Sequence, residues 1–137
     1  MDKTLKIPSN TKVFIAEDDM FISSLLVKKF ESVGAIVATV SAGDIAAANI
    51  KKEMPNIVLL DIMLPGADGF QIIQQLKADP DTKNIPVIML SNLGERDQIE
   101  KAKKYGAVNF LIKATLSVDE IIAEVAKQLA VANITRS

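Results

Sequence analysis

Acidic, hydroxyl and lysine side chains follow the short apolar segments of this sequence in a regular order. The carboxylates of residues 17–19 follow one segment, Asp61 a second, Ser91 a third and Lys113 a fourth. Carboxylate oxygens suit a hard divalent cation, and a carboxylate can itself be the nucleophile toward a phosphoryl group. A lysine and a hydroxyl can hold phosphoryl oxygens while charge develops on them. The pattern indicates phosphoryl chemistry with Mg²⁺, or Mn²⁺ in its place.

The composition excludes several other kinds of chemistry. Cysteine is absent, which excludes disulfides and thiolate sites, and so is histidine, the commonest general base and metal ligand. The net charge is −1, with no basic field that would favour nucleic acid. No apolar run approaches the ~18 residues of a membrane-spanning helix, and no signal-peptide core is present. We expect a cytoplasmic protein without direct nucleic-acid binding or membrane insertion.

The whole chain alternates between strand and helix patterns. Short apolar runs bounded by turn residues predict buried strands, and apolar residues at helical spacing predict a helix after each strand. The expected strands are 12–16, 35–40, 57–60, 86–90 and 108–112. Three helix starts are predicted by capping-box pairs, namely Ser41 with Asp44, Asp68 with Gln71, and Ser117 with Glu120.

Five strands alternating with five helices predict an α/β fold. We expect a doubly wound, five-stranded parallel sheet of order 2-1-3-4-5, the flavodoxin-like (βα)5 arrangement. In that order the polar groups at the strand ends converge on one switch point. One domain is expected at 11–132, between a flexible N-terminal tail at 1–10 and a C-terminal tail at 133–137.

Each candidate residue also has a purely structural interpretation. The dipole of the following helix favours acidic residues in its first turn, which explains one or two of residues 17–19. Asp61 alone fits a turn cap, Ser91 a turn hydroxyl, and Lys113 a solvated lysine. The functional interpretation therefore depends on these side chains converging.

With these residues in view, the sequence resembles the receiver domain of two-component response regulators, in particular the stand-alone, chemotaxis-regulator type. The resemblance covers about residues 11–131. It implies that Asp61, followed by IMLPGADG, accepts the phosphoryl group. It also implies that Asp18 binds the metal directly together with Asp61, that Glu17 binds it through water, and that the carbonyl of Met63 is a further ligand.

The resemblance assigns roles to the later residues as well. Ser91 and Lys113 would bind the phosphoryl group, with Asn92 beside them. Phe110 would be the switch aromatic that turns inward when the Ser91 hydroxyl shifts. The phosphoryl donor would be a sensor histidine kinase, a histidine phosphotransfer protein or a small phosphodonor. The output would be contact with a downstream protein through the fourth helix, fifth strand and fifth helix of a monomer or weak homodimer, with no enzyme activity beyond the domain's own phosphorylation and dephosphorylation.

Two departures from the family pattern affect this site. Lys113 is followed by Ala114, where the family usually has a cis proline. Because a cis bond to alanine costs ~3 kcal/mol, we expect either a trans bond with a moved loop or a strained cis bond. Asn92 and Met63 are bulky for their places, which predicts slow loss of the phosphoryl group. Faster autodephosphorylation than in small-residue variants would refute this.

Alternative functions were weighed against the same residues. A phosphatase of the haloacid dehalogenase type needs a second Asp two residues after the first, where this chain has Met63. A dinucleotide-binding protein needs a glycine-rich turn after the first strand, which AEDDMF lacks. A non-phosphorylated pseudo-receiver that only binds partners stays open, because Ala114 departs from the motif.

Six residues after Val131 leave no room for an effector domain, unless the chain is part of a longer protein.

Overall fold

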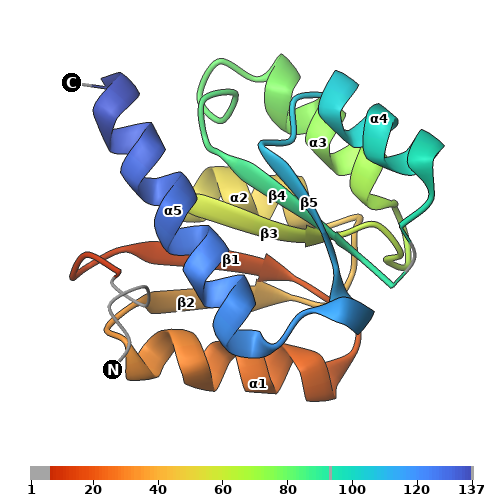
Figure 1. The fold of residues 1–137 in the computed structure, drawn as a ribbon. Helices are drawn as coiled ribbons and strands as arrows, with labels where there is room; N and C mark the ends of the chain where they lie inside the picture. The colour runs from red at the N-terminus through yellow and green to blue at the C-terminus, as the bar shows by residue number, and fades with distance from the viewer. Residues whose placement is uncertain (1–6, 93, 137) are drawn as a thin grey trace.

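A computed structural model of the chain describes residues 7–92 and 94–136, with side chains described up to residue 132. Five parallel strands form one sheet of order β2-β1-β3-β4-β5, with helices on both faces (Figure 1). The predicted fold class and strand order are confirmed. The elements are β1 (Lys12–Ala16), α1 (Met20–Ser32), β2 (Ile36–Val40), α2 (Ala46–Glu53), β3 (Ile57–Asp61), α3 (Gly69–Ala78), β4 (Val87–Ser91), α4 (Arg96–Lys104), β5 (Asn109–Ile112), the 3₁₀ turn η1 (Lys113–Thr115) and α5 (Val118–Arg136).

The sheet separates two apolar layers. Helices α1 and α5 cover one face, and α2, α3 and α4 cover the other (Figure 1). Neighbouring residues of a strand enter opposite layers: Val13 and Ile15 pack with α1 and α5, whereas Phe14 and Ala16 pack with α2 and α3. Because both faces are covered, the strands are apolar almost throughout, as parallel sheets require.

The strand register brings the polar residues to one edge of the sheet. Ala16 of β1 lies beside Leu60, the residue before Asp61 in β3. Ser91, the last residue of β4, lies beside Ile112, the residue before Lys113. The carboxyl ends of four strands therefore stop at nearly the same level.

The strand boundaries lie within one residue of the predicted ones, and the termini differ more. Helix α5 continues to Arg136, so the boundary expected at residue 132 falls inside a helix. Residues 1–6 of the expected N-terminal tail lie outside the described residues. Ile7 is buried in the layer of α1 and α5, which ties residue 7 to the folded domain.

Two of the three predicted capping boxes are confirmed. Asp68 and Gln71 exchange two hydrogen bonds of 2.9 Å at the start of α3. Ser117 and Glu120 exchange two hydrogen bonds of 2.8 and 3.1 Å at the start of α5.

The third prediction, Ser41 with Asp44, is wrong. Helix α2 begins at Ala46, with Ile45 at its N-cap and no side-chain cap. The physical reason is that the turn before α2 packs against another loop: the Gly43 N–H donates a 2.7 Å hydrogen bond to the Pro65 carbonyl oxygen.

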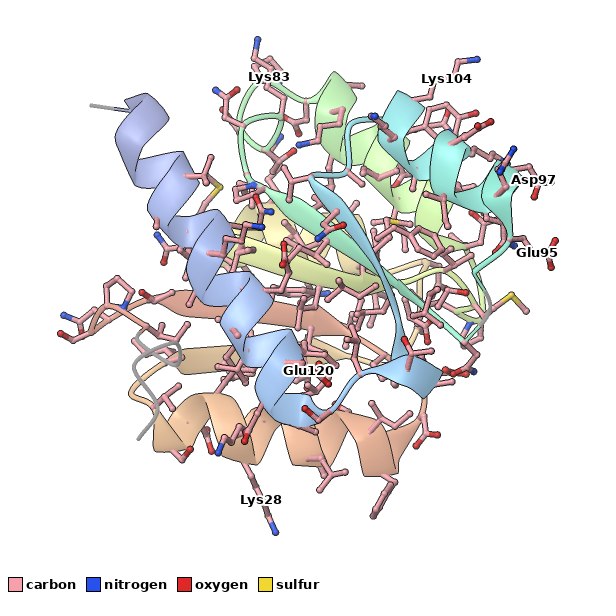
Figure 2. The ribbon with its side chains drawn as sticks, in the orientation of Figure 1. Lys28, Lys83, Glu95, Asp97, Lys104 and Glu120 are labelled. Carbon is pink, nitrogen blue, oxygen red and sulfur yellow. The ribbon has the colours of Figure 1, made fainter. Side chains whose placement is uncertain are left out.

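Helix α4 is held to the molecule by few apolar contacts. Ala102 is its one buried residue. Lys101 places its ammonium 4.5 Å from the centre of the Phe70 ring, and Tyr105 packs edge-on to the same ring, with 6.2 Å between centroids. Figure 2 shows Asp97 projecting outward from the start of α4 and Lys104 from its end, the charge order that the helix dipole favours.

Candidate functional site

Lys113 links two buried carboxylates at the carboxyl edge of the sheet. Its ammonium donates a 2.8 Å hydrogen bond to Glu17 Oε1 and a 2.9 Å hydrogen bond to Asp61 Oδ2. The side chain of Lys113 is 7% exposed, that of Glu17 0% and that of Asp61 4%. They come from the end of β1, the end of β3 and the turn after β5, so the predicted convergence of these three residues is observed.

The charges of this group are incompletely balanced, because one lysine faces two carboxylates. Burial raises the pKa of Glu17 to about 7, against the lowering effect of the hydrogen bond from Lys113. Burial alone would lower the pKa of Lys113, but its hydrogen bonds to Glu17 and Asp61 outweigh that effect and raise it. The pocket therefore keeps its lysine charged, and Glu17 holds its proton more tightly than an exposed glutamate does.

Asp18 adds a third carboxylate to the group. One oxygen each from Glu17, Asp18 and Asp61 lies within 4.8 Å of the other two, and the Asp18 side chain is exposed to solvent. An all-oxygen donor set of three carboxylates is the chemistry that a hard divalent cation requires. The residues present therefore fit Mg²⁺ or Mn²⁺.

Asp19 has a different role from its two neighbours. Its Oδ1 accepts hydrogen bonds from the N–H groups of Phe21 and Ile22, at 3.0 and 3.1 Å, and caps α1. Its own N–H donates a 3.0 Å hydrogen bond to Glu17 Oε2. The helix-start explanation thus accounts for one of the three adjacent acidic residues.

The remaining candidate residues differ in how deeply they are buried. Ser91 is 4% exposed at the end of β4, whereas Asn92 is exposed. Met63 points its side chain into solvent at 72% exposure, and its N–H donates a 3.1 Å hydrogen bond to Asp61 Oδ1. Phe110 is half-buried in β5 and lines a surface pocket against α4.

The comparison with protein families decides the identity of the domain. Residues 13–126 match the response regulator receiver domain. The chain belongs to this family. Receiver domains accept phosphoryl groups, bind Mg²⁺ or Mn²⁺ at an acidic pocket, and interact with histidine kinases or phosphotransfer proteins and with downstream targets.

Individual relatives agree with the family assignment. The receiver domain is 35% identical over 120 residues to Sporulation initiation phosphotransferase F of Bacillus subtilis, which covers 88% of this chain and 94% of that protein. It is 32% identical over 118 residues to the Phosphate regulon transcriptional regulatory protein PhoB of Rhizobium meliloti, covering 86% of this chain but 52% of that protein. The chain therefore spans about half the length of this second relative.

A solved structure supports the fold. The BeF3-activated N-terminal receiver domain of RstA from Klebsiella pneumoniae superposes with a TM-score of 0.79 at 28% identity, covering 87% of this chain and 98% of that one.

The departure at Ala114 does not prevent Lys113 from reaching the pocket. The peptide bond between Lys113 and Ala114 is trans, which rules out the strained cis bond of the second predicted arrangement. Residues 113–115 form a 3₁₀ turn directly after β5. The lysine contacts both carboxylates from this turn.

Gly69 is a contributor to the receiver site that the sequence analysis missed. A β-carbon at residue 69 would lie 2.6 Å from the backbone carbonyl oxygen of Asp61, so the start of α3 approaches the β3 end more closely than any side chain allows. The signal available in the sequence was the repeated glycine in PGADG.

Among the residues that the structure describes, no helix is both long and apolar enough to cross a bilayer.

Proposed function

We propose that this receiver domain accepts a phosphoryl group on Asp61 from the phosphohistidine of a sensor histidine kinase or a histidine phosphotransfer protein. The observation that carries the proposal is the buried Asp61 carboxylate, held 2.9 Å from the Lys113 ammonium within a cluster of three acidic residues. A carboxylate in this setting stays available as a nucleophile. The negative charge of the phosphoryl oxygens that it accepts is stabilised by the fixed ammonium of Lys113.

The chain's own residues divide the work of the transfer. A carboxylate oxygen of Asp61 attacks phosphorus, the N–P bond to the donor histidine breaks, and the released imidazole nitrogen keeps the electron pair and takes up a proton. Lys113 and the Ser91 hydroxyl bind the phosphoryl oxygens, with Asn92 at the rim.

Asp18, Asp61 and the carbonyl of Met63 would hold Mg²⁺ or Mn²⁺ directly, and Glu17 through water. The cation, when bound, supplies positive charge against the phosphoryl oxygens.

Exposed apolar side chains near the site suit a docking donor. Met20 and Phe21 at the start of α1 are 65% and 73% exposed, and Met63 after β3 is 72% exposed. The donor histidine must come within bonding distance of a side chain that is itself buried. Apolar contacts at this rim would contribute to that approach.

The output would be a population shift on the face formed by α4, β5 and α5. Phe110 is half-buried beside Ile99 and Ala102 of α4, and α4 has few apolar anchors. Movement of Ser91 toward the phosphoryl group gives Phe110 room to turn inward, and the altered face binds a downstream protein. The proposal includes a cytoplasmic location, a monomer or weak homodimer, and no reaction beyond the domain's own phosphorylation and dephosphorylation.

The test is phosphorylation by acetyl phosphate with Mg²⁺, read as a mass increase, together with Mg²⁺-dependent binding of beryllofluoride. We expect both in the unaltered chain and neither in Asp61→Asn. Asp79→Asn is the matched control, because Asp79 is also a carboxylate paired with a lysine, Lys51, at 3.0 Å. If the folded, unaltered chain takes up neither group, the pseudo-receiver alternative is the better explanation.

A further inference from the structure

The turn before α2 lies against the loop that follows Asp61. The Gly43 N–H donates its 2.7 Å hydrogen bond to the carbonyl oxygen of Pro65. A β-carbon built on Gly43 would lie 1.7 Å from the carbonyl oxygen of Ala67, closer than any side chain tolerates. The backbones of the two segments are therefore in direct contact, and a larger residue at position 43 must push the loop away.

A second contact joins the same segments. Gly66 has a φ of +91°, and a β-carbon there would lie 2.8 Å from the carboxyl carbon of Asp44. The Asp44 side chain therefore occupies the space that a side chain at position 66 would need. The two segments therefore touch at two places, Gly43 against Ala67 and Gly66 against Asp44.

This contact acts on residues 65–67, whereas core burial of Ile62 and Leu64 and several hydrogen bonds hold the rest of the loop. At one end, the Ile62 N–H donates to the Leu90 carbonyl oxygen at 3.0 Å, and the Gly69 N–H donates to the Ile62 carbonyl oxygen at 2.8 Å. The Met63 N–H donates to Asp61 itself. Residues 65–67 are held from the opposite side by the turn at residues 43 and 44.

We propose that Gly43 and Asp44 are positioning residues for the metal site, because they set the path of residues 62–68 and with it the orientation of the Met63 carbonyl relative to Asp61. The inference rests on the proposed function, in which that carbonyl is a ligand. It also gives a role to Asp44, which has the spacing of a helix cap but does not cap α2. By linkage, cation binding stabilises the contact by as much as the contact stabilises binding.

The decisive variant is Gly43→Ala, with Mg²⁺ affinity measured by calorimetric titration. We expect a dissociation constant about tenfold higher than that of the unaltered chain, as for other groups that orient a metal ligand. Gly34→Ala is the matched control. Gly34, unlike Gly43, has a positive φ, of +95°, and a β-carbon there would have nothing within 4 Å. This control should lose stability to backbone strain without a change in Mg²⁺ affinity, which separates positioning from general destabilisation.

Asp44 provides a second test that does not require a clash. Asp44→Ala removes the carboxyl group packed on Gly66, although it keeps the β-carbon, and should weaken Mg²⁺ binding several-fold. Asp44→Asn keeps the shape of the carboxyl group and should bind Mg²⁺ as the unaltered chain does. This pair decides the question if Gly43→Ala fails to fold.

A folded Gly43→Ala with unchanged Mg²⁺ affinity would overturn the inference, as would equal weakening by Asp44→Asn and Asp44→Ala. Absence of Mg²⁺ binding in the unaltered chain would instead refute the proposed function itself.

Discussion

Each end of the sheet holds a lysine, buried at the carboxyl end and half-buried at the amino end, and the two lysines have different partners. At the carboxyl end, Lys113 donates to the carboxylates of Glu17 and Asp61. At the amino end, Lys77 donates 3.0 Å hydrogen bonds to the backbone carbonyl oxygens of Lys83 and Ile85. Burial lowers the pKa of Lys77, whereas anionic partners raise the pKa of Lys113 despite burial.

Other polar side chains at the amino end also bind the backbone. Thr82 Oγ1 donates to the Leu76 carbonyl oxygen at 2.8 Å, and Asn56 Oδ1 accepts from the Lys12 N–H at 2.8 Å. Backbone partners are fixed by the fold and cannot be exchanged. The carboxylates, in contrast, can exchange their partner: the lysine can bind a phosphoryl group, and the carboxylates can bind a cation. The amino end therefore stabilises the fold, whereas the groups at the carboxyl end can do chemistry.

Removing Lys113 should have the largest effect. In Lys113→Ala we expect phosphorylation by acetyl phosphate to slow by about 100-fold or more, because the phosphoryl oxygens lose a fixed cation. Without metal, the free energy of unfolding in urea should fall by about 3 kcal/mol, since two buried carboxylates lose their partner, and Mg²⁺ should recover part of that loss. Lys12→Ala, at a half-exposed pair with Glu53, is the control and should change neither result much. Normal phosphorylation of Lys113→Ala would contradict the chemical role assigned to the lysine at the carboxyl end of the sheet.

Asp18 and Asp19 allow the same comparison within one loop. Asp18→Ala should weaken Mg²⁺ binding at least about tenfold, because a direct ligand is lost. Asp19→Ala removes the same charge but chiefly the cap of α1, and should lower the free energy of unfolding by about 1 kcal/mol. Calorimetric Mg²⁺ titration and urea unfolding of both variants test this. Equal losses of Mg²⁺ affinity would show that charge, and not position, governs the site.

Lys77→Met should have the smallest effect on the site, because Lys77 lies at the other end of the sheet. Methionine keeps the apolar stem, but the carbonyls of residues 83 and 85 lose a donor, so urea unfolding should show a loss of about 1–2 kcal/mol. Beryllofluoride binding should be unchanged. Lys83→Met is the control, since Figure 2 shows that side chain projecting into solvent. Loss of beryllofluoride binding in Lys77→Met would mean that the two ends are coupled.

Most of the fold could be predicted because its strands are buried on both faces. The segments at Ile57–Asp61 and Val87–Ser91 are fully buried, and such runs have few other interpretations. The start of α2 could not be predicted in the same way. Ser41 and Asp44 have the correct spacing for a cap, but the competing contact with residues 65–67 is distant in sequence.

The candidate site was predictable to the extent that it depends on strand ends. Glu17, Asp61 and Lys113 converge because the sheet order requires it. The different role of Asp19 was not assigned, because adjacent acidic residues look alike until the backbone direction decides which one caps α1. The contributions of Gly43 and Gly69 depend on close backbone approach, which a sequence pattern does not encode.

Tyr105 is the single tyrosine of a chain that has no tryptophan, and it ends α4 with its ring against Phe70. Near-ultraviolet emission from the unlabelled protein therefore originates mainly from one ring beside the helix expected to move. Fluorescence titrations could follow activation of this domain without any dye or engineered reporter.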